Sequence, residues 1–154
     1  MEDFQGKLAN VGAIRKFLLA GRARFTVRSE KTGTRFTYRV KAAPKPEDPM
    51  KDQAYFVSVL TGPENETDYE FIGTVFRSVG GGIVYRHSRK SRIGTDAPSA
   101  RGFYWLSTLL TRDDSTVLPS AEVWHEGICG RCGRTLTVPE SIESGFGPEC
   151  IGKV

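Results

Sequence analysis

The sequence predicts an α+β fold with a mainly antiparallel sheet of five or six strands, two helices and a small cysteine-containing C-terminal module. Three observations lead to this prediction. Segments between residues 24 and 85 alternate apolar and polar side chains, or form short apolar runs bounded by turn residues, as paired strands do. Two segments space their apolar residues as helices do. All three cysteines lie in the last thirty residues.

The two predicted helices span residues 11–20 and 98–110. The first places its apolar side chains on one face, with Asn10 as the N-cap and Gly21 as the C-terminal stop. The second follows Asp96, a good N-cap residue, and is apolar nearly all round. We therefore expect residues 98–110 to form the central core helix and to cover one face of the sheet, whose apolar surface has no other partner.

The first predicted hairpin pairs residues 24–29 with residues 34–41 through a turn that ends at Gly33. Alternation along both strands separates an apolar face from a basic face, which carries Arg24, Arg28, Arg35, Arg39 and Lys41. One interpretation is a solvated outer face. Like charges opposite each other on paired strands are destabilising, however, and a solvated face usually includes acidic residues. The pattern therefore favours a face that binds a polyanion.

Four further strands are predicted by short apolar or alternating runs, at residues 55–60, 69–76, 83–85 and 121–125. The first two of these form a second hairpin. A segment rich in proline, lysine and acids, residues 42–53, is expected to be a mobile loop. We place a boundary in the polar connection after the second helix, so that residues 1–118 form an α+β domain and residues 119–154 a zinc-binding module.

The formal net charge of +4 is unevenly distributed along the chain. Residues 44–70 carry seven acids and two bases. The remainder carries 20 bases and 11 acids, a balance of +9. Such a basic field attracts phosphate backbones or acidic protein surfaces.

A second basic segment, residues 86–92, interleaves small hydroxyl side chains with Arg86, Arg89, Lys90 and Arg92. Guanidinium groups and serine hydroxyls are suited to phosphate contacts. A solvated basic loop before a helix explains the same composition, and both interpretations stay open.

The cysteines have the spacing of a metal site. Cys129 and Cys132 form a C-x2-C pair, which places two thiolates on one tight turn, and Cys150 follows after seventeen residues. Zn²⁺ prefers four ligands in a tetrahedron, and His125 is the nearest good candidate for the fourth. The alternatives for that position are Glu126, Glu149, water or a ligand from another chain. A redox pair or a disulfide scaffold fits less well, because the thioredoxin-like context and an even cysteine number are missing.

The spacing also predicts a shape, because C-x2-C forms a knuckle, residues 134–138 a short strand and residues 140–144 one helical turn. This arrangement resembles a treble-clef or zinc-ribbon module. The string Cys-Gly-Arg-Cys-Gly-Arg-x-Leu-Thr-x-Pro-x-Ser-Ile-x-x-Gly-x-Gly-Pro-x-Cys further resembles the signature of a family of unknown function found in phage, plasmid and some bacterial proteins. The resemblance covers about the last quarter of the chain. It implies zinc and a phage or mobile-element origin.

Two function classes follow from these patterns. The first is a non-catalytic nucleic-acid-binding accessory protein that contacts the phosphate backbone of DNA or RNA through the basic hairpin face, the 86–92 segment, Arg131 and Arg134. The second, implied by the resemblance, is a phage-encoded inhibitor of a host defence system, similar to anti-CRISPR proteins, that acts on a nucleoprotein complex. Salt-sensitive binding to bare nucleic acid distinguishes them.

An enzyme is not predicted. The glycine-rich phosphate-binding motifs and the H-E-x-x-H motif are absent from the sequence, and four protein ligands leave a zinc ion no open position for a substrate water. Unpaired cysteines with metal-type spacing fit the reducing cytoplasm, the host's if the protein is phage-encoded. No apolar run approaches the length of a membrane span. The oligomeric state is not predicted.

Overall fold

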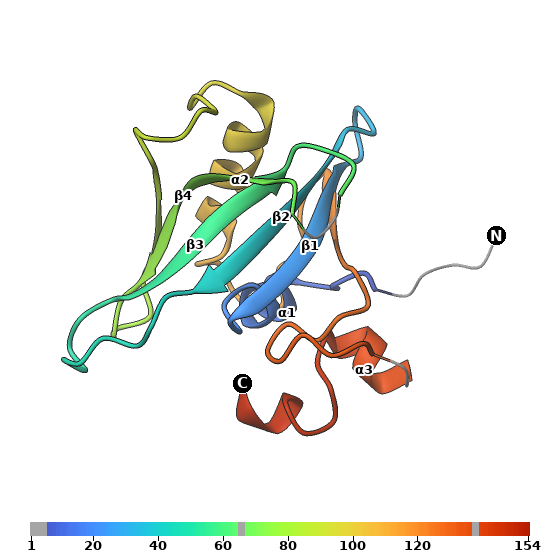
Figure 1. Cartoon of the computed structure of the whole chain (residues 1–154). Helices are drawn as coiled ribbons and strands as arrows, with labels where there is room; N and C mark the ends of the chain where they lie inside the picture. Colours follow the sequence, from blue (N-terminus) through green and yellow to red (C-terminus); the bar gives the residue numbers. More distant parts are fainter. Residues whose placement is uncertain (1–5, 65–66, 137–138) are drawn as a thin grey trace.

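A computed structural model describes residues 6–64, 67–136 and 139–154 of the chain. Its centre is one six-stranded, fully antiparallel sheet in the order β5-β4-β3-β2-β1-β6 (Figure 1). The strands are β1 (Arg22–Ser29), β2 (Arg35–Ala42), β3 (Gln53–Leu60), β4 (Tyr69–Arg77), β5 (Ile83–His87) and β6 (Ala121–His125). Sequential strands are neighbours except β6, which returns to the free edge of β1.

The helices are α1 (Val11–Leu18), α2 (Pro98–Leu109) and α3 (Pro139–Ser144), with a 3-10 turn at Ile151–Lys153. The helix α2 lies across one face of the sheet, while α1 lies at one end, beside the C-terminal module (Figure 1). No helix of the described chain covers the opposite face, which we call the outer face. This face is the one that Arg24 and Arg39 occupy by alternation, since Ala23, Phe25 and Val40 are buried.

Aromatic side chains hold α2 on the sheet. The Phe103 ring lies 5.3 Å from the Tyr38 ring and 5.0 Å from the Tyr85 ring, both edge-on. The Tyr38 hydroxyl donates a 2.7 Å hydrogen bond to the Ser99 carbonyl, and burial raises the pKa of this tyrosine far above its ordinary value. The predicted core helix is therefore confirmed, and its packing on β2 and β5 spans most of the sheet.

The predicted fold class is confirmed, with small differences in local structure. Asn10 caps α1, since its side chain accepts a 2.9 Å hydrogen bond from the Ala13 N–H. Asp96 does not cap α2. Its N-cap is Ala97, which makes no side-chain cap hydrogen bond, and Pro98 in the first turn has no N–H to be capped.

The C-terminal module shares its core with the sheet. The strand β6, assigned to the module by its sequence position, pairs with β1 along residues 121–125. Module residues Cys129, Leu136 and Phe146 belong to the same buried cluster as the sheet and α1. The boundary at residues 118 and 119 therefore does not separate two hydrophobic cores. The predicted strand at 134–138 contributes only a bridge between Ile128 and Thr135, and its residues 137–138 lie outside the described chain.

We predict that Tyr38→Phe lowers the free energy of unfolding by about 1–3 kcal/mol, because the Ser99 carbonyl loses its buried donor. Chemical denaturation measures the change. Tyr104→Phe is the matched control, since Tyr104 lies on α2 with 59% of its surface exposed. Equal unfolding free energies for Tyr38→Phe and the wild type would show that this hydrogen bond does not stabilise the α2 contact.

Candidate metal centre and basic sheet face

The knuckle is a tight turn stabilised by its own backbone. The Cys129 N–H donates a 2.8 Å hydrogen bond to the Arg134 carbonyl, and the Gly133 N–H donates a 3.0 Å bond back to the Cys129 carbonyl. Gly133 has a φ of +81°, a conformation that glycine adopts without steric cost. The turn therefore brings Cys129 and Cys132 to one side of the loop.

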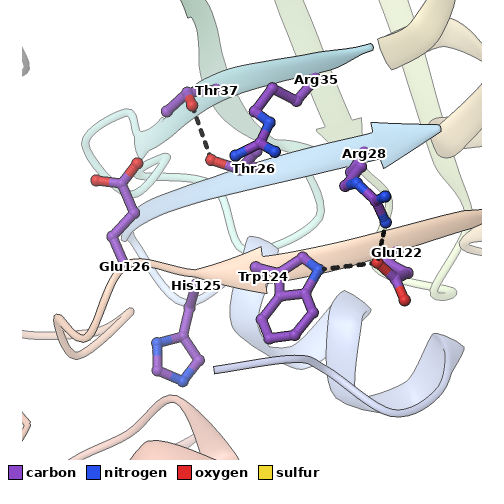
Figure 2. A pocket seen from close by; sticks show the side chains of 8 residues that line it. All are labelled: Thr26, Arg28, Arg35, Thr37, Glu122, Trp124, His125 and Glu126. Carbon is purple, nitrogen blue, oxygen red and sulfur yellow. Dashed lines mark hydrogen bonds and ion pairs between the residues drawn. The ribbon is translucent and has the colours of Figure 1, made fainter. Parts of the chain in front are cut away.

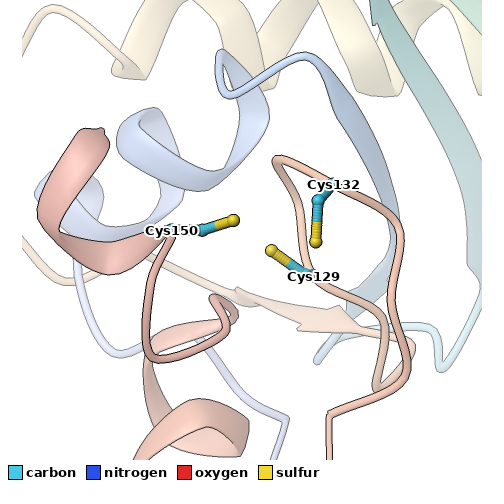
Figure 3. Close-up of side chains that lie close together, drawn as sticks. All are labelled: Cys129, Cys132 and Cys150. Carbon is cyan, nitrogen blue, oxygen red and sulfur yellow. The ribbon is translucent and has the colours of Figure 1, made fainter.

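Cys150 reaches the knuckle from the other half of the module, at the residue that precedes the 3-10 turn. Sulfur atoms of the three cysteines lie within 4.8 Å of one another, and Figure 3 shows them pointing together from two separate loops. Cys129 and Cys150 are buried, while Cys132 is half-buried. All three thiols are free.

Hydrogen-bond donors surround these sulfur atoms. The N–H groups of Arg131 and Gly147 each lie 3.4 Å from the Cys129 sulfur, and the Arg131 guanidinium lies 3.6 Å from that of Cys150. Burial works against the Cys129 thiolate, but N–H donors at Cys132, Gly147 and Arg131 lower its pKa to about 7. Although Arg131 favours the Cys150 thiolate, burial and the neighbouring sulfur atoms raise the pKa of Cys150 above its ordinary value.

Three converging thiols are suited to a soft or borderline metal ion. Such an ion binds thiolates, and N–H donors to sulfur are the usual support of that charge. A metal would also remove the mutual repulsion that opposes ionisation of three neighbouring thiols, because a coordinating thiol is deprotonated. The donor set therefore fits a metal site, as the spacing predicted.

The structure brings together three of the four predicted ligands and leaves His125 outside the group. His125 pairs with Phe25 on the core side of the sheet and is 1% exposed. Its Nδ1 atom accepts a 2.9 Å hydrogen bond from the Gly127 N–H, and its ring centroid lies 5.6 Å from that of Phe17. In this structure the imidazole supports the turn that leads into the knuckle.

The module packs on α1 through Phe17 and two glycines. A Cβ atom built on Gly130 would lie 2.7 Å from the Phe17 ring, and one on Gly145 would lie 2.6 Å from it. The Phe146 ring centroid lies 5.8 Å from that of Phe17. These contacts leave no room for side chains at either glycine, so the backbone of both cysteine loops rests directly on α1.

The basic hairpin face is formed as the alternation predicted. The β1–β2 register pairs Arg24 with Arg39 and Arg28 with Arg35. It also pairs Arg22, which sequence reasoning missed, with Lys41. Arg22 shares the alternation of Arg24, but the predicted strand began two residues too late to include it.

Two acidic residues, Glu122 of β6 and Glu126 directly after it, neutralise part of this face. Glu122 lies 3.0 Å from the Arg28 guanidinium, and Glu126 lies 4.0 Å from that of Arg24. Burial disfavours the Glu122 carboxylate, but hydrogen bonds from Lys7, Trp124 and Arg28 lower its pKa below the ordinary value. This end of the face is an open depression of about 660 Å³. Figure 2 shows the residues that line it, with the His125 side chain on the other side of β6 from Thr26 and Arg28. Repulsion among the arginines is thus partly relieved within the protein itself.

The opposite end of the face stays basic. A depression of about 360 Å³ is lined by Arg22, Arg24, Arg39, Lys41, Ile128 and Gly133. Its wall includes the knuckle, and the Arg22 guanidinium donates a 3.4 Å hydrogen bond to the Cys132 carbonyl. The cysteine cluster and the basic face are therefore neighbours, joined by a β1 residue that reaches the knuckle. We call this hollow the basic depression.

The 86–92 segment is placed farther away, because β5 is the opposite edge strand from β6. Arg86 lies on the outer face of β5, paired with Thr74 of β4. Arg89 and Lys90 are exposed, and the Arg92 guanidinium lies 4.0 Å from the Glu70 carboxylate. Of the two predicted module contacts, Arg131 is turned toward the cysteines, and Arg134 lies on the exposed surface beside Cys132.

Sequence reasoning also missed two exposed aromatic residues on the outer face. Phe56 of β3 is 45% exposed and Phe71 of β4 is 37% exposed, and their ring centroids lie 6.3 Å apart. The strand 55–60 is apolar on both faces, so its alternation did not reveal an exposed ring.

The comparisons with known proteins concern the C-terminal module alone. A model described as a family of unknown function (DUF6011) matches residues 120–154, which contain β6 and all three cysteines. No curated protein and no solved structure matches the chain. The match agrees with the resemblance to a family of unknown function. Its description names neither a source nor an activity, so the phage origin stays a prediction.

We predict that Cys132→Ser abolishes tight metal retention, whereas His125→Ala keeps the wild-type metal content and lowers stability by about 1–3 kcal/mol. The serine change removes one of three ligands. The alanine change leaves the Gly127 N–H without its acceptor and opens space beside Phe17. Metal analysis after dialysis against a competing chelator, with thermal denaturation, measures both. Loss of metal from His125→Ala equal to that from Cys132→Ser would make the imidazole a ligand.

Proposed function

We propose that this protein is a zinc-containing, non-catalytic nucleic-acid-binding accessory protein. Zn²⁺ is the ion that combines a preference for thiolates with tetrahedral sites on C-x2-C knuckles. The described residues supply three thiolates and no carboxylate or imidazole within 4.8 Å of all three. The fourth position would then belong to a solvent molecule or to an added ligand.

The proposed role of the metal is structural. A zinc hydrolase needs a general base next to the metal-bound water. No carboxylate or imidazole of the described chain lies within 4.8 Å of all three sulfur atoms, and the carboxylate nearest in sequence, Glu149, lines the same hollow as Cys132 and Cys150. The Arg131 guanidinium beside Cys150 instead balances the negative charge of the thiolates. Metal binding would then supply folding free energy to a module that has short elements and few buried apolar side chains.

The basic depression is the observation that carries the nucleic-acid proposal. Four cationic side chains line it, and among the described residues only Arg24 has a carboxylate neighbour, Glu126, at 4.0 Å. The knuckle forms one wall, so the zinc ion would fix the shape of the hollow. Guanidinium forks arranged in this way suit phosphate oxygens. These contacts position a nucleic-acid backbone and do not read its sequence.

The metal proposal predicts one zinc ion per chain in protein purified without chelator. Three thiolates on a preformed site bind zinc more tightly than the harder divalent ions of the cell. Elemental analysis of the purified protein measures metal identity and stoichiometry together. Protein that is fully folded and carries no zinc, or carries another metal in its place, would contradict the proposal.

The nucleic-acid proposal predicts that Arg39→Ala/Lys41→Ala weakens binding to oligonucleotides of any sequence. The slope of log Kd against log salt should fall by about two, because each lost phosphate contact removes about one unit. Stability should not decrease, since two like-charged cross-strand pairs are removed. Fluorescence anisotropy over a salt series measures both affinity and slope.

The matched control is Arg101→Ala/Arg112→Ala, which removes the same charge from α2 and the turn after it. This variant should keep wild-type affinity and slope. Wild-type behaviour of Arg39→Ala/Lys41→Ala would show that the outer face is only solvated. Absence of binding by the wild type, with a stable protein partner retained after nuclease treatment, would favour the inhibitor of a nucleic-acid-processing complex.

A further inference from the structure

The outer face places exposed aromatic rings between two sets of cations. The register aligns one row across β1 to β5, formed by Arg22, Lys41, Phe56, Thr74 and Arg86. Lys41 and Phe56 are direct cross-strand neighbours, as are Phe56 and Thr74. Across three strand spacings of about 4.8 Å, Lys41 and Arg86 stand roughly 14 Å apart with the Phe56 ring between them.

A second row runs parallel to the first. It begins at Arg24 and passes through Arg39 and Ser58 to Phe71. The Arg39 guanidinium lies 4.4 Å from the centroid of the Tyr69 ring, which belongs to the same strand as Phe71. The arginine that lines the basic depression is thus in contact with the aromatic part of the face. Cations and rings form one continuous surface.

The exposure of these rings is costly for a protein that only needs a solvated sheet face. Large apolar side chains gathered on a surface mark an interaction site when polar groups surround them. Phe56 and Phe71 lie on neighbouring strands, and Ser58, the cross-strand partner of Phe71, is buried. A β-bulge between Val57 and Ser58 sets the register that brings the two rings together.

We propose that Phe56 and Phe71 are a stacking platform for the bases of single-stranded nucleic acid, with phosphates held by the basic depression on one side and by Arg86 on the other. This inference rests on the proposed nucleic-acid function and narrows it to unpaired strands. Bases in a duplex are stacked on each other and show no face to a protein ring, whereas every unpaired base does. Exposed rings with cationic side chains on both sides therefore fit a single strand, whose bases stack on the rings while its phosphates contact the cations. A duplex would contact the cations alone and leave the rings without a partner.

The test compares ligands that differ only in their bases. An oligo(dT) of about 12 nucleotides, within the ~4–16 nucleotides that such modules cover, is compared with an abasic oligomer and a duplex of equal length. Fluorescence anisotropy should show wild-type protein binding oligo(dT) at least tenfold more tightly than the abasic oligomer. Phe56→Ala/Phe71→Ala should lose that difference, keep its affinity for the abasic oligomer, and keep the wild-type salt slope.

Two controls separate stacking from folding. Tyr104→Ala removes an exposed aromatic ring from α2, on the other side of the sheet, and should bind as the wild type does. Phe56→Tyr/Phe71→Tyr keeps both aromatic faces and should retain the preference for oligo(dT). A thermal midpoint near the wild-type value shows that each variant is folded.

The outcomes distinguish this inference from the function on which it rests. Equal affinity of the wild type for oligo(dT) and the abasic oligomer, or an unchanged preference in Phe56→Ala/Phe71→Ala, would overturn the platform while leaving phosphate binding intact. Wild-type protein that binds none of the three ligands would overturn the nucleic-acid function, and the platform with it.

Discussion

The packing of the Phe17 ring against the C-terminal module is the contact on which the rest of the structure depends. Gly130 from the knuckle and Gly145 from the second loop both meet that ring at distances that exclude any side chain. His125 and Phe146 complete its surroundings. Because the two loops carry Cys129 and Cys150, α1 fixes the backbone from which the thiols converge. The cysteine cluster is therefore built on the hydrophobic core of the sheet.

The same packing determines which surface is left for binding. Both α1 and α2 pack into the single hydrophobic core, so no helix of the described chain covers the outer face of the sheet. Glu122 neutralises Arg28 at one end of the hairpin face, and Glu126 lies near Arg24. The charges of Arg22, Arg39 and Lys41 remain beside the knuckle. Arg22 connects that basic end to the Cys132 carbonyl. A metal in the cluster would thus act on the proposed binding surface through the position of the knuckle.

The described residues include no helix that is long and apolar enough to cross a membrane.

The sequence predicted the α+β class, the hairpins, both long helices and the cysteine cluster, because local periodicity and ligand spacing encode them. It did not predict the ion pairs that form when strands far apart in the sequence become neighbours. The ion pairs of Glu122 and Glu126 depend on β6 joining β1, about a hundred residues away in the chain. The position of His125 was in fact encoded, since Ala121, Val123 and His125 share one buried face by alternation. Its distance from Cys129 predicted a ligand, whereas the strand pattern accounts for its buried place beside Phe17. The exposure of Phe56 follows from its place between the buried residues Tyr55 and Val57, and a mostly apolar run gives no signal of which face is exposed.

The central claim is that the outer face of the sheet is the binding surface for nucleic acid. The most direct measurement is an NMR titration of the zinc-loaded protein with a short single strand. We expect amide and aromatic resonances to shift on the outer face of β1 to β5 and in the knuckle beside Arg22, and those of α2 around Tyr104 to stay unchanged. Shifts concentrated on α2, or no shifts on the sheet at an oligonucleotide concentration that saturates binding, would contradict it.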